Sequence, residues 1–217
     1  MIAILNEFKR GLYLRRLARI ASACTVLFFA TFAGAQIQQM DIAVGYGRLL
    51  AFKDLNASEA LIPPQEKGGV FPSVSFDAFV RNRLGFNAET SWEYKKASYD
   101  GYESYRPIFT DVNALFEPQI RKKLSLDLMA GVGVDSNRFY LPGMTGCTAV
   151  AGTCYVSSDH FMEHASLGVR YYVWHRIPHI FIRPEIHYYH IQNNVEFHSD
   201  NVYRATFSVG YTFHNTK

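Results

Sequence analysis

The feature that most limits how this chain can fold is a two-residue alternation of apolar and polar side chains. It is clearest over residues 203–213, where every odd position is apolar and every even position is polar or glycine. Residues 84–94 and 124–134 show the same division with few exceptions. Successive side chains of a β-strand point to opposite faces, so each segment is expected to be a strand with one apolar and one polar face. The pattern predicts an all-β fold.

Weaker copies of the alternation raise the number of expected strands to eight. They cover residues 40–49, 70–80, 108–117, 161–172 and 180–190. The short connections between the eight segments are 81–83, 118–123 and 173–179, and the longer ones are 50–69, 95–107, 135–160 and the intermediate 191–202. An even number of strands with alternating short and long connections predicts an antiparallel up-and-down barrel, with short periplasmic turns and long external loops.

Two prolines depart from this pattern, and Pro72 is the lesser departure because it lies close to the outer end of its strand. Pro184 lies inside the seventh expected strand, and proline cannot donate a hydrogen bond to a neighbouring strand. A closed barrel has no free edge that could accommodate the missing donor. We therefore expect a β-bulge at Pro184.

The chemistry of the two faces favours a transmembrane barrel over a soluble one such as a lipocalin, whose polar face would be rich in Lys and Glu. The polar face here is small and mixed, and its glycines are Gly45, Gly47, Gly85, Gly131, Gly133, Gly168 and Gly210. The apolar face is aromatic near the strand ends, with Tyr46, Trp92, Tyr94, Tyr188 and Tyr203 at one end and Phe86, Phe116, Tyr171, Tyr211 and Phe213 at the other. Small residues suit a crowded interior, and aromatic belts mark the two membrane–water boundaries.

The N-terminus has the organisation of a cleaved signal peptide. Five basic residues between Lys9 and Arg19 precede an apolar run over residues 20–32, and the run leads into Ala33-Gly34-Ala35. The run is too short for a spanning helix, which needs about 20 apolar residues, and the small residues fit a cleavage site. We expect residues 1–35 to be the signal peptide and residues 36–217 to be a single barrel domain.

The charge of the expected mature chain argues against nucleic-acid binding. The whole chain has 22 Lys and Arg residues and 19 Asp and Glu residues, but residues 1–35 hold five of the former and one of the latter. The remainder has 17 basic and 18 acidic residues and is close to neutral. Proteins that bind nucleic acid usually show a basic excess, so we expect no nucleic-acid partner.

Two cysteines remain after the expected cleavage. Cys147 and Cys154 lie close together in a Gly-, Thr- and Ala-rich segment, and a close pair in an exported protein predicts a disulfide. A zinc site that adds His160 or His164 is a weaker alternative, because two cysteines do not complete a zinc site by themselves. The chain contains no phosphate-binding loop or nucleotide motif, and the spacing of its histidines fits no metal template. We expect no cofactor and no metal.

The chain resembles the small OmpA/OmpX-like outer-membrane β-barrel superfamily. The resemblance rests on the signal ending in Ala33-Gly34-Ala35, on the eight amphipathic strands and on the last strand, Phe207-Ser208-Val209-Gly210-Tyr211-Thr212-Phe213, with its terminal aromatic. It implies a location in the outer membrane of a Gram-negative-type bacterium, among outer-membrane lipid and lipopolysaccharide. It also implies that the barrel-assembly machinery recognises the last strand.

Strand parity turns a set of charged residues toward the barrel interior. The set comprises Asp77, Glu89, Glu93, Asp111, Asp127, Glu185, Arg170, Arg183, Arg204, His164 and His187. Counting from the inner end predicts one layer of Asp77, Asp127, Arg170 and Arg183, with Glu89 and Glu185 next to it. An eight-stranded barrel is only wide enough for side chains to fill, and buried charges must be paired. We expect these six residues to form an ion-pair network that closes the interior.

A catalytic interpretation rests on His164 and Ser166. The His-x-Ser of this segment is similar to the motif of outer-membrane lipid A deacylases, in which His and Ser work with a carboxylate, and Glu185 could orient His164. The next residue is Leu167, where the deacylase motif has Asn, and parity turns the pair inward rather than toward lipid.

We therefore favour a barrel without enzymatic activity that supports envelope integrity or binds extracellular partners through loops 50–69 and 135–160. A lipid A-modifying enzyme and a narrow, porin-like solute channel remain the alternatives.

Overall fold

The computed structural model describes residues 37–51, 68–81, 83–99, 103–140, 154–173, 179–194, 196–197 and 200–214. The expected signal peptide, residues 1–35, lies outside this part of the chain, as does Cys147. Within the described residues, no helix is long and apolar enough to cross a membrane.

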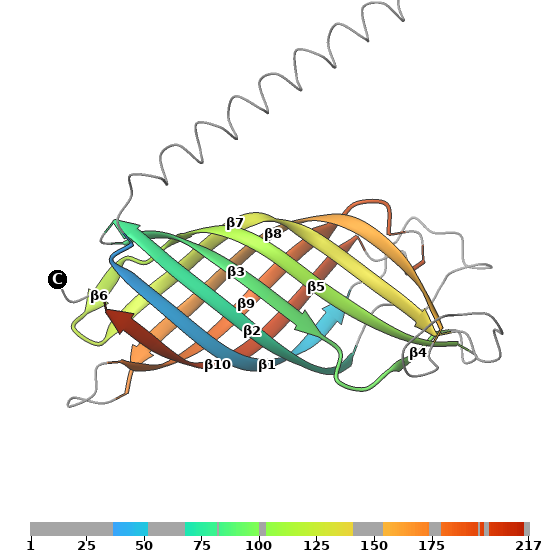
Figure 1. Cartoon of the computed structure of the whole chain (residues 1–217), viewed down its shortest axis with the longest axis horizontal. Coiled ribbons are helices and arrows are strands. Elements are labelled where there is room, and N and C mark those ends of the chain that lie inside the picture. Colours follow the sequence, from blue (N-terminus) through green and yellow to red (C-terminus); the bar gives the residue numbers. More distant parts are fainter. Residues whose placement is uncertain are drawn as a thin grey trace, which may run out of the picture. The chain divides into compact units, whose positions relative to one another are not determined.

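The strands are β1 (Gln39–Ala51), β2 (Gly68–Arg81), β3 (Leu84–Trp92), β4 (Ala97–Tyr99), β5 (Glu103–Phe116), β6 (Gln119–Arg121), β7 (Leu124–Tyr140), β8 (Tyr155–Tyr172), β9 (Ile180–Ile191) and β10 (Asn201–His214). Eight of them form a closed antiparallel barrel in which each strand pairs with the next in sequence and β1 pairs with β10. The short strands β4 and β6 extend the sheet at β5 and β7 (Figure 1). The predicted up-and-down barrel is confirmed.

Burial alternates along the strands as the sequence predicts. In β10, the even residues from Val202 to Thr212 are buried and the odd residues from Asn201 to Phe213 are exposed. The exposed apolar side chains form the outer face all around the barrel, and those of β7, β9 and β10 include Leu128, Val132, Val134, Ile186, Tyr203, Phe207, Val209, Tyr211 and Phe213. The inner face is polar, so the barrel has the inside-out distribution of a membrane protein.

Two glycines on the inner face show why small residues recur there. A Cβ at Gly210 would lie 2.2 Å from the Phe181 ring, and one at Gly168 would lie 2.7 Å from Cγ of Glu185. The glycines leave room for larger side chains of the neighbouring strand β9.

At the long-connection end, several strands continue further than the sequence predicts. The β7–β8 ladder runs to the pair Tyr140 and Tyr155, whereas residues 135–160 were expected to form a loop. Outward positions change from apolar to polar after Val134, and the Ser136 hydroxyl donates a 2.5 Å hydrogen bond to Asp159. The apolar pattern therefore ends where the expected lipid contact ends, while the hairpin continues beyond it.

The β-bulge expected at Pro184 is wrong. Pro184 lies opposite Phe207 of β10 with no shift of register. On the β8 side, the recorded pairs pass from Gly168 and Glu185 to Tyr171 and Ile182 in the same register. The β8–β9 ladder is thus interrupted for two residues on each strand, but no extra residue is inserted, as a bulge would require. The recorded register shifts lie elsewhere, between Gly47 and Leu49 on β1, between Phe79 and Arg81 on β2 and between Gln119 and Arg121 on β6.

The facing of the strands predicts the effect of a new charge. Leu128→Arg places a guanidinium within the apolar band of β7, where Leu128 is exposed, and we expect a cost of about 2–4 kcal/mol in free energy of unfolding. Leu50→Arg makes the same change at the end of β1 and should cost about 0–1 kcal/mol, since the penalty falls near the interface. Denaturant unfolding in lipid vesicles measures both. Equal costs would contradict the assigned membrane band.

Candidate functional site: the charged interior

The interior holds more carboxyl groups than guanidinium groups. Eight carboxyl side chains of the described residues are buried, and they are Asp41, Asp77, Glu89, Glu93, Asp111, Asp127, Asp135 and Glu185. The buried arginines of the same residues are Arg170, Arg183 and Arg204. The six predicted network residues are all among them. Asp41 was missed by the sequence analysis, although it has the same parity as Gly45 and Gly47 and could have been found from it.

Arg170 of β8 is the centre of the innermost charged layer. Its guanidinium donates hydrogen bonds to Oδ2 of Asp41, to Oδ2 of Asp77 at 2.7 Å and to Oδ2 of Asp127 at 2.9 Å. Glu117, in the turn after β5, adds an ion pair at 3.2 Å, and the Phe181 ring lies 4.4 Å from the guanidinium carbon. Arg170 is fully buried, so its charge is balanced by these carboxylates alone rather than by solvent.

Glu117 lies at the mouth of the barrel, outside the strands. Burial raises the pKa of this carboxyl to about 7, the Asp127 carboxylate acts in the same direction, and Arg170 opposes both. Its Oε1 accepts a 2.5 Å hydrogen bond from the Ser125 hydroxyl. Glu117 was missed from the sequence, although it ends the expected strand 108–117 with the same parity as the inward Asp111.

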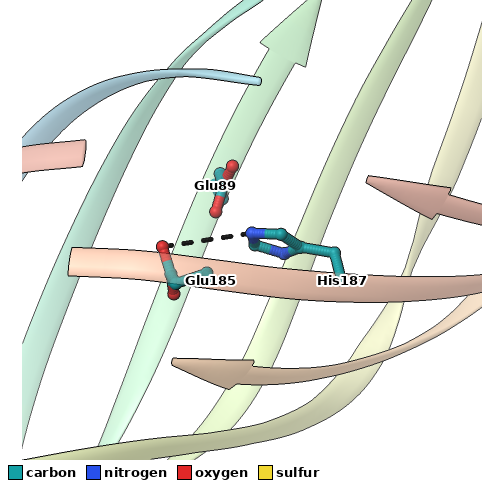
Figure 2. A group of neighbouring side chains, drawn as sticks. All are labelled: Glu89, Glu185 and His187. Atoms are coloured by element: carbon teal, nitrogen blue, oxygen red, sulfur yellow. Dashed lines mark ion pairs between the residues drawn. The ribbon is translucent and has the colours of Figure 1, made fainter. Parts of the chain in front are cut away.

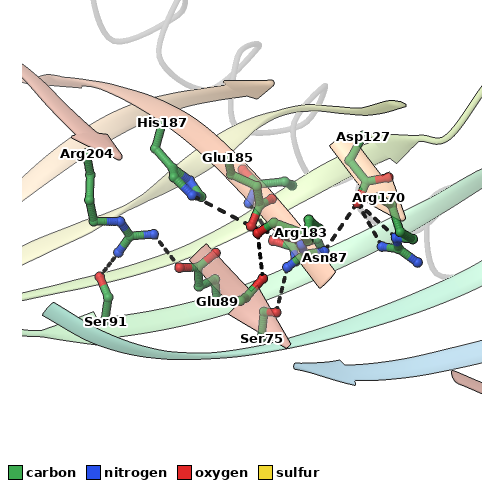
Figure 3. Close-up of polar contacts among 12 residues, drawn as sticks. Ser75, Asn87, Glu89, Ser91, Asp127, Arg170, Arg183, Glu185, His187 and Arg204 are labelled. Atoms are coloured by element: carbon green, nitrogen blue, oxygen red, sulfur yellow. Dashed lines mark hydrogen bonds and ion pairs between the residues drawn. The ribbon is translucent and has the colours of Figure 1, made fainter. Parts of the chain in front are cut away.

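Arg183 of β9 joins this layer to the next one (Figure 3). It donates to Oδ2 of Asp77 at 2.8 Å and to the Ser75 hydroxyl at 2.8 Å, and its Nε lies 2.9 Å from Oε2 of Glu185. Asp77 therefore contacts both Arg170 and Arg183, which keeps the two guanidinium groups in adjacent positions.

A chain of hydrogen-bonded amides and imidazoles leads from the layer of Arg170 and Arg183 across the barrel interior. Asn87 donates to Asp77 at 2.6 Å, and Asn113 donates to Asn87 at 2.9 Å and to Asp111 at 2.5 Å. This hydrogen-bonded chain continues at the side-chain oxygen of Asn113, which lies 2.7 Å from Nδ1 of His164. It thereby links carboxylates of two strands to the histidines.

The histidines stack on each other and continue the hydrogen-bonded chain. Nε2 of His164 lies 3.1 Å from Nδ1 of His187, and the two rings are nearly parallel at 5.3 Å between centroids. Nε2 of His187 lies 3.9 Å from Oε2 of Glu185. Arg204 lies directly opposite His187 on the neighbouring strand β10, and it donates hydrogen bonds to Glu89 and to the Ser91 hydroxyl.

Apolar layers lie on both sides of the charged zone. The outer one is a buried cluster near the long-connection end, made of Leu49, Phe71, Phe109, Met162, Tyr189, Ile191 and Val202. The inner one contains Phe79, Leu115 and Met129. Beyond the outer layer, the rings of Tyr99, Tyr105, Phe139 and Phe197 pack with centroid distances between 5.0 and 6.4 Å. Side chains therefore fill the described interior at successive levels.

The residues of the catalytic interpretation do not come together. His164 and Ser166 both point inward, but the nitrogens of His164 contact Asn113 and His187. Oγ of Ser166 makes no hydrogen bond within the described residues, and Glu185 lies next to His187 rather than orienting His164. The structure thus places the imidazole of His164 beside that of His187. The two residues lie on different strands, so residue spacing within one strand could not predict this contact.

The predicted disulfide between Cys147 and Cys154 falls partly outside the described residues. Cys154 precedes β8, whereas its expected partner Cys147 lies outside the described residues. The bridge stays a prediction.

The fold is shared with solved outer-membrane barrels, although no family model and no curated protein sequence matches the chain. The attachment invasion locus protein Ail of Yersinia pestis is 14% identical, with 82% of this chain and 100% of that one covered and a TM-score of 0.52. Neisserial surface protein A is 14% identical, covering 81% and 96%, with a TM-score of 0.52. A major outer membrane protein from Thermus thermophilus is 10% identical, covering 80% and 99%, with a TM-score of 0.53. The chain has the fold of a small outer-membrane β-barrel.

The geometry around Arg170 predicts a large effect of its removal. Arg170→Ala leaves the carboxylates of Asp41, Asp77 and Asp127 buried beside one another, and we expect a loss of about 3–5 kcal/mol in free energy of unfolding. Arg121→Ala removes an exposed arginine in β6 and should change it by less than about 0.5 kcal/mol. Urea unfolding of the two variants in the same vesicles tests this. Similar small losses would show that the carboxylates do not depend on Arg170.

Proposed function

We propose that the chain is an outer-membrane barrel that does not conduct solutes and that acts through the surface of its long-connection end, in addition to supporting the envelope. The observation that supports this most is the filled interior, in which an ion-paired zone lies between two apolar layers. An interior of this kind leaves the outer surface and the protruding strands as the places where a ligand can bind.

The exposed apolar face supports placement in a membrane. Large apolar side chains are exposed on every long strand, among them Val44, Phe76, Val112, Val132, Leu167, Ile186 and Val209. Water would oppose exposure of so extensive an apolar surface, whereas lipid accepts it. We orient the long connections outward, as in the usual arrangement of outer-membrane barrels.

The long-connection end of β5, β7 and β8, together with the residue before β4, has a basic and aromatic surface. We call this surface the outer basic patch and define it as Lys96, Arg106, Arg138, Tyr140 and Tyr155. Arg106 and Arg138 are direct cross-strand neighbours. Lys96 lies 3.5 Å from the centroid of the Tyr140 ring, and the guanidinium carbon of Arg138 lies 4.9 Å from that of Tyr155. Like charges directly opposite each other destabilise a sheet, and a bound anion would offset that cost.

Anionic groups are therefore the partners that fit the outer basic patch. In the proposed orientation, the phosphates of lipopolysaccharide are the nearest source of such groups. The solved structures similar to this chain include Ail in complex with the heparin analogue sucrose octasulfate, which is also anionic, with 13% identity and a TM-score of 0.51. We propose that this chain binds anionic groups at the outer basic patch, with lipopolysaccharide as the first candidate.

A binding measurement tests the patch. Arg106→Gln combined with Arg138→Gln should weaken binding of the refolded protein to lipopolysaccharide by about 30-fold at low salt, since each cation near an anionic surface contributes about 1 kcal/mol. Arg81→Gln combined with Arg121→Gln removes two exposed arginines at the opposite end and should leave binding unchanged. Competition by soluble sucrose octasulfate distinguishes a general anion site from one that requires the lipid. Equal binding by both double variants would contradict the proposal.

Conductance and acyl-chain release test the alternatives. In planar bilayers we expect no conductance above that of the lipid, because the described interior is filled, and no release of acyl chains from lipopolysaccharide, because His164 and Ser166 are not hydrogen-bonded to each other. A stable unitary conductance would favour the channel. Release that is lost in Ser166→Ala would favour the enzyme.

A further inference from the structure

We propose that Glu89, Glu185 and His187 bind one divalent transition-metal cation inside the barrel, with zinc as the probe that represents this class. Figure 2 shows the three side chains converging from β3 and β9. One potential ligand atom from each lies within 4.8 Å of the others, and all three residues are buried. The proposal is independent of the outer basic patch and goes beyond the proposed function.

The hydrogen bonds of the neighbouring amides determine which nitrogen of each histidine is protonated. Asn87 and Asn113 both direct their amide nitrogens toward carboxylates, those of Asp77 and Asp111 respectively. The side-chain oxygen of Asn113 is therefore the atom that faces Nδ1 of His164. An amide oxygen only accepts, so Nδ1 of His164 must carry a hydrogen and donate it. Oδ1 of Asp111, 3.4 Å from the same nitrogen, is a second acceptor at that position.

The protonation of His164 then determines the state of His187. In a neutral His164 that is protonated on Nδ1, Nε2 is an acceptor, so Nδ1 of His187 donates the 3.1 Å hydrogen bond between the rings. Nε2 of a neutral His187 is left with an unprotonated lone pair. This atom makes no hydrogen bond within the described residues and lies 3.9 Å from Oε2 of Glu185.

A bare imidazole nitrogen and a carboxylate oxygen thus face each other, and both are acceptors. A metal cation between them would satisfy both lone pairs. Metal-binding histidines commonly donate their other ring N–H to a hydrogen-bond acceptor, which holds the ring in position. His187 has this arrangement, because its Nδ1 donates to His164, which in turn donates to the side-chain oxygen of Asn113.

The balance of buried charge also favours a cation. In the described residues, three buried arginines lie among six buried carboxyl groups, which are Asp41, Asp77, Glu89, Asp111, Asp127 and Glu185. Arg170 and Arg183 contact mainly Asp41, Asp77 and Asp127, while Arg204 contacts Oε1 of Glu89 and Arg183 contacts Oε2 of Glu185. Each of the two glutamates retains a further oxygen. Neither oxygen of Glu185 accepts a hydrogen bond that meets normal geometry within the described residues.

The donor set indicates the class of cation. Imidazole nitrogen and carboxylate oxygen are both ligands of zinc and related transition metals, at bond lengths of about 2.0–2.2 Å. Calcium and magnesium prefer all-oxygen sites with six or more ligands. No metal was expected from the sequence, because the spacing of the histidines fits no metal template. Glu89 lies on a strand distant in sequence from Glu185 and His187, so spacing alone could not place the three side chains together.

Metal content after refolding tests the site. The full-length chain, without an added histidine tag, is first treated with a chelator in denaturant. It is then refolded with excess zinc, because the apolar layers restrict entry of a metal to the folded barrel. Unbound metal is removed afterwards. Elemental analysis should find about one zinc per chain. Absence of bound zinc from correctly folded protein, as judged by its gel mobility without heating, would overturn the proposal.

Two histidines of β9 provide a matched pair of variants. His187→Gln should lower zinc affinity by at least about tenfold, whereas His190→Gln changes a histidine of the opposite, outward face and should retain the wild-type metal content. Glu185→Gln should behave like His187→Gln, and magnesium or calcium in place of zinc should not be retained. Wild-type zinc content in folded His187→Gln would place the metal elsewhere and overturn the proposal.

An X-ray absorption spectrum of the wild-type protein identifies the metal ligands even if the interior variants do not fold. X-ray absorption of the bound zinc should show nitrogen and oxygen ligands at about 2.0–2.2 Å and no sulfur, since zinc–sulfur bonds are about 2.3 Å long. Sulfur ligands would assign the metal to cysteines and would overturn the site at Glu89, Glu185 and His187.

Discussion

The ion pairs of Arg170 are the interaction on which the rest of the interior depends. Its guanidinium contacts the carboxylates of Asp41, Asp77 and Asp127, which come from β1, β2 and β7. Isolated carboxylates at these positions would be very costly to bury, so a barrel with this sequence is stable only when β8 brings Arg170 into register with all three. The ion pairs to Asp41 and Asp77 thereby connect β8 to β1 and β2, with which it does not pair, and they oppose any slip of register.

Strand parity is the part of this arrangement that the sequence could predict. A two-residue period determines the face to which each side chain points, and it correctly placed Asp77, Asp127, Arg170 and Arg183 inside the barrel. Parity also applied to Asp41, which was overlooked. It could not predict which inward residues meet across the barrel, because that depends on the stagger of all eight strands. The contact between His164 and His187 depends on this stagger, as does the separation of His164 from Ser166.

The strand ends were predictable only as far as the lipid imposes a pattern. Outward positions are apolar up to Val134, and beyond it the ladder continues with Ser136, Arg138 and Tyr140 facing outward. Water accepts polar side chains on this part of a strand, so the sequence there no longer differs from that of a loop. Pro184 was misjudged for a related reason. A proline removes one donor, and the barrel loses local pairing without changing the register that its other strands impose.

The two proposed sites have opposite charge because they lie in different surroundings. Arg106 and Arg138 are partly exposed on the outward face, where water screens their repulsion and lets two cations remain adjacent until an anion binds. The carboxylates around Glu185 have no such screening, so their excess negative charge must be reduced by protons or by a bound cation. Protons can reside on several of these groups, but the hydrogen bonds from Asn113 through His164 leave one lone pair, that of Nε2 of His187, directed at a carboxylate. A proton there would make His187 an imidazolium close to Arg183 and Arg204, whereas a metal would also bind Glu89. The metal content of the refolded protein therefore distinguishes the two ways of neutralising the same buried charge.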